Sequence, residues 1–420
     1  MNKSIERITV VGGGTTGYLT VFRLAKQYPT KLITWIYPED NDPIGVGEAI
    51  IPEVSNMLLQ YCEVTHKDII KECNGTLKLG VHFVGWNTPD ESFYFTFGHE
   101  PPNPRHNSAS LDRIIDTGKV PADILDYTDI ATHFRAPELL KYLDRVVYKF
   151  KNIKIERRTV TLGELEGTYD LLIDCTGFKR ALTQWTDNYL SIQDKIPNNQ
   201  AYVYRTAYTD REKQCLPYTV ACAMNYGWIF NIPLTNEIAC GYVHPNKYNI
   251  MDEFIEYLKT KFGVDSIDES KIRKVPMITG RNHIHLKDNV VAIGLSSNFI
   301  EPLESTGLFL VVSALDQLAN YIDGTISEKE YNIYINEEFD SLTDFIIAHY
   351  KYSKRSNEYW DHYKNIPIER NPISIFPNSG WDSILSGFFP EIKRPKEPLD
   401  PKELINIHKG KKYYEWIKGV

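Results

Sequence analysis

The chain has 420 residues, a formal net charge of −8 and a pI of about 5.8. Its length is sufficient for one large core, and the acidic balance gives no indication of a general binder of nucleic acids or anionic membranes. The longest apolar run, at 308–312, is far shorter than the about 20 residues that cross a bilayer. Residues 1–8 lack the apolar core of a signal peptide. Six cysteines without a CxxC pair predict a reduced, cytoplasmic protein.

The first 37 residues predict a β-α-β unit. A β-branched run at 7–11 is followed by a glycine-rich turn at 12–17, by helical spacing of apolar residues at 18–28 and by a second strand at 31–37. This order predicts parallel strands joined by a right-handed crossover.

The glycine-rich turn itself indicates a dinucleotide site. Gly12, Gly14 and Gly17 fit the pattern GxGxxG between a strand and a helix. Glycines at these positions allow a tight turn and let a pyrophosphate approach the helix N-terminus, with Thr15 and Thr16 in the same turn. A purely structural glycine turn is the alternative.

The choice between FAD and NAD depends on later segments. An acidic residue that binds the ribose is expected at the end of the second strand, but this strand ends at Tyr37 with Glu39 and Asp40 beyond it, so the ribose partner stays open. The sequence has no second fingerprint and therefore no indication of a built-in nicotinamide site. A second glycine-rich loop, suited to a flavin ring or its ribityl chain, consists of Gly45, Val46, Gly47, Glu48 and Ala49. Asp174 ends a buried strand at 169–174 and is either a flavin-site residue or a turn residue.

The remaining pattern predicts an α/β protein with a Rossmann-like FAD-binding core of the hydroxylase type, an added antiparallel sheet and a helical C-terminal substrate region. We expect helices at 52–61, 136–150, 305–322 and 328–364, strands at 200–243 and 289–293, loops at 87–135, and a surface-wrapping segment from about 365. The expected units are an interlocked core at 1–330 and a C-terminal region at 331–420 that completes the substrate site.

Two polar clusters far apart in the chain contain candidate site residues. Lys78 lies in a segment at 72–86, where it is either a surface lysine or a buried amine. The run 301–307, Glu-Pro-Leu-Glu-Ser-Thr-Gly, contains Glu304, which is either a helix-capping acid or a base. Ser305, Thr306 and Gly307 begin the next predicted helix, where free N–H groups favour an anion.

These segments, in this order, resemble the flavin-dependent halogenases of the tryptophan-halogenase type. The resemblance covers roughly residues 5–362 and includes Gly-Trp-Ile-Phe-Asn-Ile-Pro at 227–233, the 301–307 run and Asp-Phe-Ile-Ile-Ala-His-Tyr at 344–350. Residue usage rich in Lys, Ile, Asn and Tyr suits an AT-rich genome and is compatible with compact, phage-encoded members of the family.

The resemblance implies a reaction and a set of partners. FAD, used as FADH2 and supplied by a separate flavin reductase, would work with O2 and a halide ion (chloride, bromide or iodide) to give hypohalous acid that halogenates a small electron-rich aromatic, of indole or phenol type. Lys78 would confine this oxidant, and burial would supply its neutral amine. Glu304 would polarise the oxidant or accept the ring proton.

Further roles follow from position in the family. The halide would lie at Ser305, Thr306 and Gly307, and Leu295 and Leu308 would contact the flavin. Trp228 and Phe230 are either site aromatics or core residues, and residues 349 and 350 are expected to be packing residues. No His/Cys/Asp cluster in the sequence predicts a metal site.

Two departures keep alternatives open. Phe230 replaces the second tryptophan of the family's WxWxIP signature, and the chain is shorter than typical tryptophan halogenases. A flavin-dependent aromatic monooxygenase needs neither Lys78 nor Glu304, and a flavin-binding protein without catalysis remains a further reading. The preferred halide, the regiochemistry, a carrier-bound substrate and a homo-oligomeric state are left open by the sequence.

Overall fold

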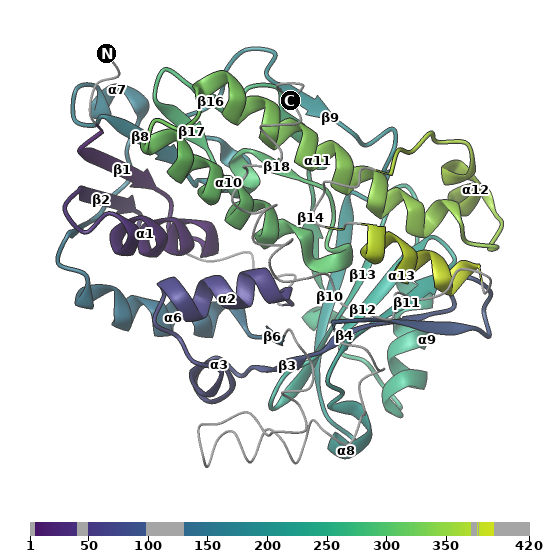
Figure 1. Cartoon of the computed structure of the whole chain (residues 1–420). Coiled ribbons are helices and arrows are strands. Elements are labelled where there is room, and N and C mark those ends of the chain that lie inside the picture. The colour runs from purple at the N-terminus through teal and green to yellow at the C-terminus, as the bar shows by residue number, and fades with distance from the viewer. Residues whose placement is uncertain (1–4, 40–48, 98–129, 371–375, 377, 390–420) are drawn as a thin grey trace.

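A computed structural model describes residues 5–39, 49–97, 130–370, 376 and 378–389. The loop expected at Gly45, Val46, Gly47 and Glu48 lies outside the described residues; Ala49, at its end, is described. Figure 1 shows two sheet layers side by side, the nucleotide-type unit near the N-terminus and the long antiparallel sheet, with helices α10 and α11 running across both. The α/β class expected from the sequence is confirmed.

The first layer is a six-stranded sheet in the order β16-β17-β8-β1-β2-β7. All neighbours pair in parallel except β16 and β17, which are antiparallel. The expected β-α-β unit is confirmed, because α1 (Thr15–Gln27) connects the parallel neighbours β1 and β2. The strands are β1 (Arg7–Val11), β2 (Leu32–Tyr37), β7 (Ile153–Arg157), β8 (Leu171–Asp174), β16 (Leu286–Lys287) and β17 (Val290–Ala292).

The second layer is a seven-stranded sheet in the order β14-β10-β13-β12-β11-β4-β5. Its pairs are antiparallel except β4 with β11, so the antiparallel sheet expected at 200–243 is confirmed. Its strands are β4 (Gly80–Val84), β5 (Ser92–Thr96), β10 (Gln200–Ala207), β11 (Thr219–Met224), β12 (Gly227–Pro233), β13 (Glu237–His244) and β14 (Arg273–Pro276).

Two smaller sheets complete the strands of the described residues. One contains β9 (Tyr189–Ser191), β15 (Gly280–Asn282) and β18 (Asn298–Phe299), and the other pairs β3 (Thr76–Lys78) with β6 (Ala131–His133). The expectation of loops throughout 87–135 was therefore wrong at both ends, at β5 and β6. The expectation rested on prolines in the middle of that region. Near its start, the alternating Phe93 and Phe95 bury one face of β5.

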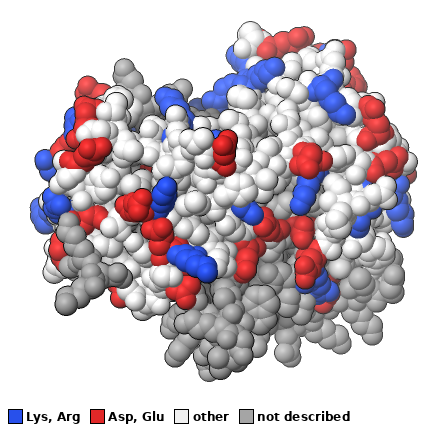
Figure 2. All heavy atoms as spheres, turned by 90° about the horizontal axis from the view of Figure 1, so that it is seen from above, with Lys and Arg blue, Asp and Glu red and all other residues white. Residues whose placement is uncertain are grey.

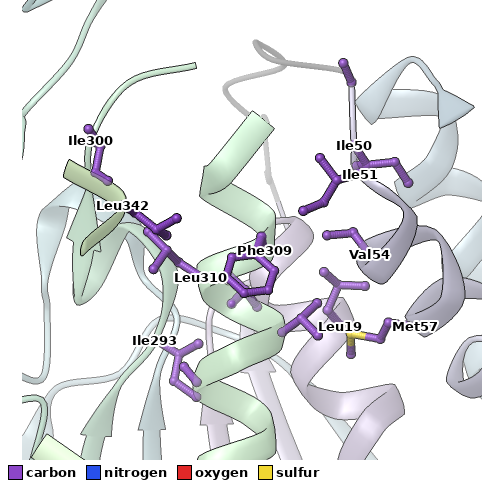
Figure 3. Close-up of a cluster of buried hydrophobic side chains, with 14 of the residues drawn as sticks. Leu19, Ile50, Ile51, Val54, Met57, Ile293, Ile300, Phe309, Leu310 and Leu342 are labelled. Atoms are coloured by element: carbon purple, nitrogen blue, oxygen red, sulfur yellow. The ribbon is translucent and has the colours of Figure 1, made fainter. Parts of the chain in front are cut away.

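Helix α10 (Thr306–Ile322) is the centre of the helical packing. Its Phe309 and Leu310 lie between Leu19 of α1 and Val54 of α2 (Pro52–Tyr61) on one side and Leu342 of α11 (Glu328–Lys351) on the other (Figure 3). A helix buried on most of its circumference is apolar nearly all round, as this sequence is. The other helices are α3 (His66–Glu72), α6 (Ala136–Val146), α7 (Leu162–Leu165), α8 (Arg211–Gln214), α9 (Met251–Phe262), α12 (Glu358–Lys364) and α13 (Asn378–Phe388), with 3₁₀ turns η1 (Val147–Lys149), η2 (Gly177–Lys179), η3 (Glu269–Lys271), η4 (Gly294–Ser296) and η5 (Leu303–Ser305).

The segment after residue 365 is partly core rather than surface wrapping. In α13, Trp381 and Phe388 are buried. The Phe388 ring meets Phe93 of β5 edge-on at 5.2 Å between centroids, and Trp381 meets Phe345 of α11 at 5.4 Å. Burial of these aromatic side chains outweighs the proline- and charge-rich composition that suggested a surface segment.

The surface is mixed in charge. On the face drawn in Figure 2, Lys and Arg side chains are interspersed with Asp and Glu side chains over the described residues. Within those residues, no helix combines the length and apolarity needed to span a bilayer.

The glycine turn provides a test of the packing. A Cβ added to Gly17 would lie 2.0 Å from the Gly12 carbonyl oxygen, whereas one added to Gly14 meets nothing within 4 Å. We expect Gly17→Ala to lower the free energy of unfolding by about 1–3 kcal/mol or more, as overpacking does, and Gly14→Ala by less than about 1 kcal/mol. Urea unfolding of the two apo-proteins measures this difference, and equal losses would contradict it.

Candidate active site

The glycine turn leaves one side open to a ligand. Gly12 has φ +128°, and a Cβ on it would lie 2.2 Å from the Cys175 carbonyl oxygen, so the turn is pressed against β8. Gly14 is the N-cap of α1, no side chain caps this end, and a Cβ at Gly14 would enter open space. The free N–H groups and the space beside them fit a pyrophosphate. Thr15 and Thr16, in the first turn of α1, are half-buried beside it.

Of the described residues expected to line the cofactor, the glycine turn, Asp174 and Leu295 lie at the carboxyl ends of β1, β8 and β17. Gly294, with φ +69°, lies so close to Thr16 that a Cβ would be 2.4 Å from its hydroxyl oxygen. Leu295 in η4 and Leu308 in α10 are half-buried. In an α/β sheet, ligands bind outside the carboxyl ends of parallel strands, so this edge fits a flavin nucleotide.

Asp174 organises the adjoining loop. Its carboxylate is fully buried and accepts hydrogen bonds from the Thr176 amide and hydroxyl, the Leu182 amide and the hydroxyls of Thr183 and Ser296, at 2.7–3.2 Å. Five donors occupy the carboxylate, and four of them belong to the loop at 174–183, which Asp174 therefore orders.

Lys78 is a buried amine rather than a surface lysine. It ends β3 with 1% of its surface exposed, and its Nζ donates a hydrogen bond to the Ser305 hydroxyl at 3.0 Å. The Phe97 ring centroid lies 5.5 Å from Nζ. Burial lowers the pKa of Lys78 to about 8, and attraction to Glu304 opposes that shift. A substantial neutral-amine population therefore exists at mildly alkaline pH.

Ala49 pairs with the strand that lies beside Lys78. It forms an isolated antiparallel bridge to His133 of β6, the strand that also pairs Ala131 with Lys78. The end of the second glycine-rich loop thus lies beside the strand pair that carries the amine.

Glu304 and Ser305 form a strained turn ahead of α10. Both have left-handed backbones, at φ 60° and 56°, which cost about 1–2 kcal/mol per non-glycine residue. Ser305 is the N-cap of α10, directs its hydroxyl to Lys78, and forms no side-chain cap. Within the described chain, the buried hydroxyl of Thr306 has no hydrogen-bond partner. This hydroxyl and the first amides of α10, which include that of Gly307, fit a small anion.

His349 belongs to the site, although the sequence suggested a packing residue. Its Nε2 lies 3.0 Å from Glu304 Oε1, and both side chains are almost completely buried. These residues are separated by 45 positions, and no periodicity links a turn residue to a helix residue at that distance. The contact is therefore decided by how α11 packs on α10.

A second buried acid lies three residues before Glu304. Glu301 accepts hydrogen bonds from the Tyr350 hydroxyl at 2.5 Å and from Asn198 Nδ2 at 2.7 Å, and Tyr359 donates to Asn198 Oδ1 at 3.1 Å. Burial raises the pKa of Glu301 to about 7, while its donors oppose the rise. This network clamps α11 and α12 to the turn that carries Glu304.

Trp228 and Phe230 are almost fully enclosed in the antiparallel sheet. They are 2% and 3% exposed, and Trp228 lies 6.3 Å from Trp86 between ring centroids. The Phe230 ring covers its cross-strand partner Gly241, where a Cβ would lie 2.0 Å from the ring. A phenylalanine at this position thus fills the space that the glycine leaves.

The described residues contain no cluster of three or more His, Cys, Asp or Glu side chains arranged to hold a metal ion. All six cysteines are buried free thiols.

Similarity to known proteins extends over most of the chain. The family model described as tryptophan halogenase matches residues 7–110 and 147–380. The 7-chloro-L-tryptophan 6-halogenase KtzR of Kutzneria sp. (strain 744) is 28% identical over 428 residues, covering 86% of this chain and 82% of KtzR. The tryptophan 7-halogenase RebH of Lentzea aerocolonigenes is 28% identical, covering 88% and 80%. The solved tryptophan 6-halogenase SttH of Streptomyces toxytricini shares the fold, with a TM-score of 0.76, 24% identity and complete coverage of both chains.

Glu301 generates a test of pH-dependent stability. Because its folded-state pKa of about 7 exceeds the unfolded value of about 4.3, the unfolded chain loses the proton first as pH rises. The free energy of unfolding should therefore fall by about 1–3 kcal/mol between pH 4.5 and pH 7. Glu301→Gln removes this contribution, so its stability relative to the parent should increase from pH 5 to pH 8.

Urea unfolding at pH 5, 6, 7 and 8 measures this slope. Glu166→Gln, at an exposed position, is the matched control and should follow the parent at every pH. An unchanged slope in Glu301→Gln would show that the buried acid does not titrate in this range.

Proposed function

The chain belongs to the tryptophan halogenase family, a family of flavin-dependent halogenases, and from that premise we propose that it halogenates a small electron-rich aromatic of indole or phenol type. The observation that carries this proposal is the buried Lys78 amine, which donates a hydrogen bond to Ser305, next to Glu304. A buried amine and a buried carboxylate on opposite flanks of one turn are what confined halogenation requires, and a simple monooxygenase has no need of them.

The cofactor is assigned to the nucleotide edge. Gly12, Gly14 and Gly17 with Thr15 and Thr16 would hold the FAD pyrophosphate, and Leu295 and Leu308 would face the flavin. The loop of Gly45, Val46, Gly47, Glu48 and Ala49 would lie against it, and Asp174 would order the loop beside it. Bound reduced flavin, which a separate flavin reductase would supply, provides with O2 the oxidising equivalent that converts halide into hypohalous acid.

The halide is assigned to the start of α10. Partial positive charge from the helix, the amides of Thr306 and Gly307 and the hydroxyls of Ser305 and Thr306 favour a small anion there. The buried Thr306 hydroxyl, which has no hydrogen-bond partner among the residues that the structure describes, supports this assignment, because a buried donor without a partner is costly. Chloride, bromide and iodide share this chemistry, and the assay distinguishes them.

Lys78 would hold and orient the oxidant in a site that excludes water. Its neutral form can accept the halogen as a haloamine, and its ammonium form can donate a hydrogen bond to hypohalous acid. Glu304 would accept the proton that the aromatic carbon releases, so that the ring electrons return to the aromatic system. Trp228 and Phe230 would support the site from the core of the antiparallel sheet, and the region from 331 would close its substrate side through α11.

Two further observations support a choice of substrate and of cellular compartment. The curated relatives named above act on tryptophan or chlorotryptophan, which supports an indole as the first substrate to test. The six buried free thiols support a reducing compartment such as the cytoplasm.

A turnover screen tests the proposal. The protein is supplied with FAD, NADH, a flavin reductase and O2, and is offered tryptophan, simple indoles and phenols, each with chloride, bromide or iodide and with catalase in parallel wells. Mass spectrometry should detect a halogen mass shift that depends on the halide. Hydroxylated products alone would indicate a monooxygenase, and tight FAD binding without any product would indicate a flavin-binding protein.

Lys78→Met is the decisive variant, because it keeps the buried apolar stem and removes the amine. We expect at least a 100-fold loss of halogenated product with FADH2 oxidation retained, whereas Lys154→Met, at an exposed position, should behave as the parent. If the neutral amine is the working form, the parent's rate should rise between pH 7 and pH 9, through the lowered pKa of about 8. Halogenation that survives Lys78→Met would refute the role of this amine.

A further inference from the structure

One ring nitrogen of His349, Nδ1, has a fixed protonation state. Its Nδ1 lies 2.9 Å from the main-chain carbonyl oxygen of Phe345. A carbonyl oxygen only accepts hydrogen bonds, so Nδ1 must carry a proton. The protonation of the ring is then decided by the contact at its other nitrogen.

At that nitrogen, one proton must lie between His349 and Glu304. Nε2 is 3.0 Å from Glu304 Oε1, and a neutral imidazole with its proton on Nδ1 would set a lone pair against a carboxylate lone pair. Two arrangements avoid this repulsion: an imidazolium with a carboxylate, or a neutral imidazole with a carboxylic acid. Each places a single proton in the contact, but only the imidazolium with a carboxylate leaves Glu304 able to accept a further proton.

His133, another buried histidine, has different hydrogen-bond partners. His133 also lies close to Lys78, but the Thr76 hydroxyl donates to the Pro233 carbonyl oxygen at 2.6 Å and therefore accepts from His133 Nδ1 at 2.8 Å. The other nitrogen, Nε2, accepts from the Thr219 hydroxyl at 2.9 Å. Burial and the nearby Lys78 amine hold the pKa of His133 well below its usual value. His133 is therefore a neutral histidine satisfied by hydroxyl groups.

The rings that surround His349 are apolar, and few charged groups lie close to it. The rings of Phe83, Trp86 and Phe345 lie at 5.3, 6.2 and 5.1 Å from the imidazole between centroids. The charged and titratable groups facing the pair are Lys78, beyond Glu304, and Glu301, which His349 influences through its charge. In such an enclosure the charges on either side of a shared proton are weakly screened. The hydrogen bond therefore restricts the positions of both side chains.

The turn at 304–305 divides its two side chains between different partners. With two successive left-handed residues, the backbone directs Glu304 to α11 and Ser305 to β3. Commitment of Glu304 Oε1 to the imidazole leaves Oε2 as the oxygen that can take a proton from a substrate.

We propose that His349 is a positioning residue of the halogenation step, which through this shared proton holds Glu304 with Oε2 available as the proton acceptor. The inference rests on the proposed function, since it concerns the step in which Glu304 receives the ring proton. In that step the C–H electron pair returns to the ring, the proton passes to Oε2, and the imidazolium keeps its own proton.

Two variants separate positioning from packing. His349→Phe keeps a ring in the enclosure but has no donor, whereas His349→Gln keeps an N–H donor that does not titrate. We expect His349→Phe to lower kcat for halogenation 10- to 100-fold with KM within about twofold and FADH2 oxidation unchanged. His349→Gln should recover at least a third of the kcat, because its amide keeps an N–H donor for Glu304. His244→Gln, which replaces another fully buried histidine with two hydrogen-bonded nitrogens, is the control and should keep the parent's kcat and KM.

A measurement without turnover makes the inference independent of the substrate. In 15N-histidine NMR of the apo-protein at pH 7, the resonance missing from His349→Gln identifies His349. We expect both of its ring nitrogens to be protonated in the parent, with Nε2 deprotonated in Glu304→Gln, whose amide can donate in place of the shared proton.

The outcomes are distinguishable. An Nε2 that is unprotonated in the parent, or equal losses of kcat in both His349 variants, would overturn the positioning role. A parent that halogenates nothing while the NMR signature is present would count against the proposed function and leave the shared proton established.

Discussion

The site depends on one strained turn, at Glu304 and Ser305. Two consecutive non-glycine residues adopt left-handed backbones, and the strain persists because each side chain is held by a different element. Ser305 meets Lys78 of β3, and Glu304 meets His349 of α11. A regular helical start would place successive side chains about 100° apart around one axis, and it would not serve these two partners together.

Burial gives these polar groups their chemical character. Lys78, Glu304 and His349 are almost completely removed from water, where an unpaired charge is costly and a paired one is strongly oriented. The pKa of Lys78 falls while that of Glu301 rises, because desolvation disfavours the charged form of each. An amine that can lose its proton and an acid that can keep its proton are thus both held next to the turn at Glu304 and Ser305.

The scaffold brings three distant segments to this turn. The pairing of β3 with β6 carries Lys78, α10 begins at the turn, and α11 packs along α10 (Figure 1). The nucleotide edge is coupled to the same centre, because Gly294 lies against Thr16 and η4 lies against α10. A cofactor at the glycine turn and a reacting aromatic near Lys78 would therefore be held by one continuous core.

The sequence by itself determined the elements whose signals are local. The β-α-β unit with its glycine turn, the antiparallel sheet and the α10 and α11 helices follow from periodicity and turn chemistry, and Lys78 and Glu304 stood out through family resemblance. Only the tertiary structure decided that β5, β6 and α13 are parts of the core, that Asp174 accepts hydrogen bonds from four donors of its own loop and one of η4, and that His349 faces Glu304. These features depend on contacts between segments far apart in the chain, and such contacts are fixed by the packing of whole elements, for which a local pattern carries no signal.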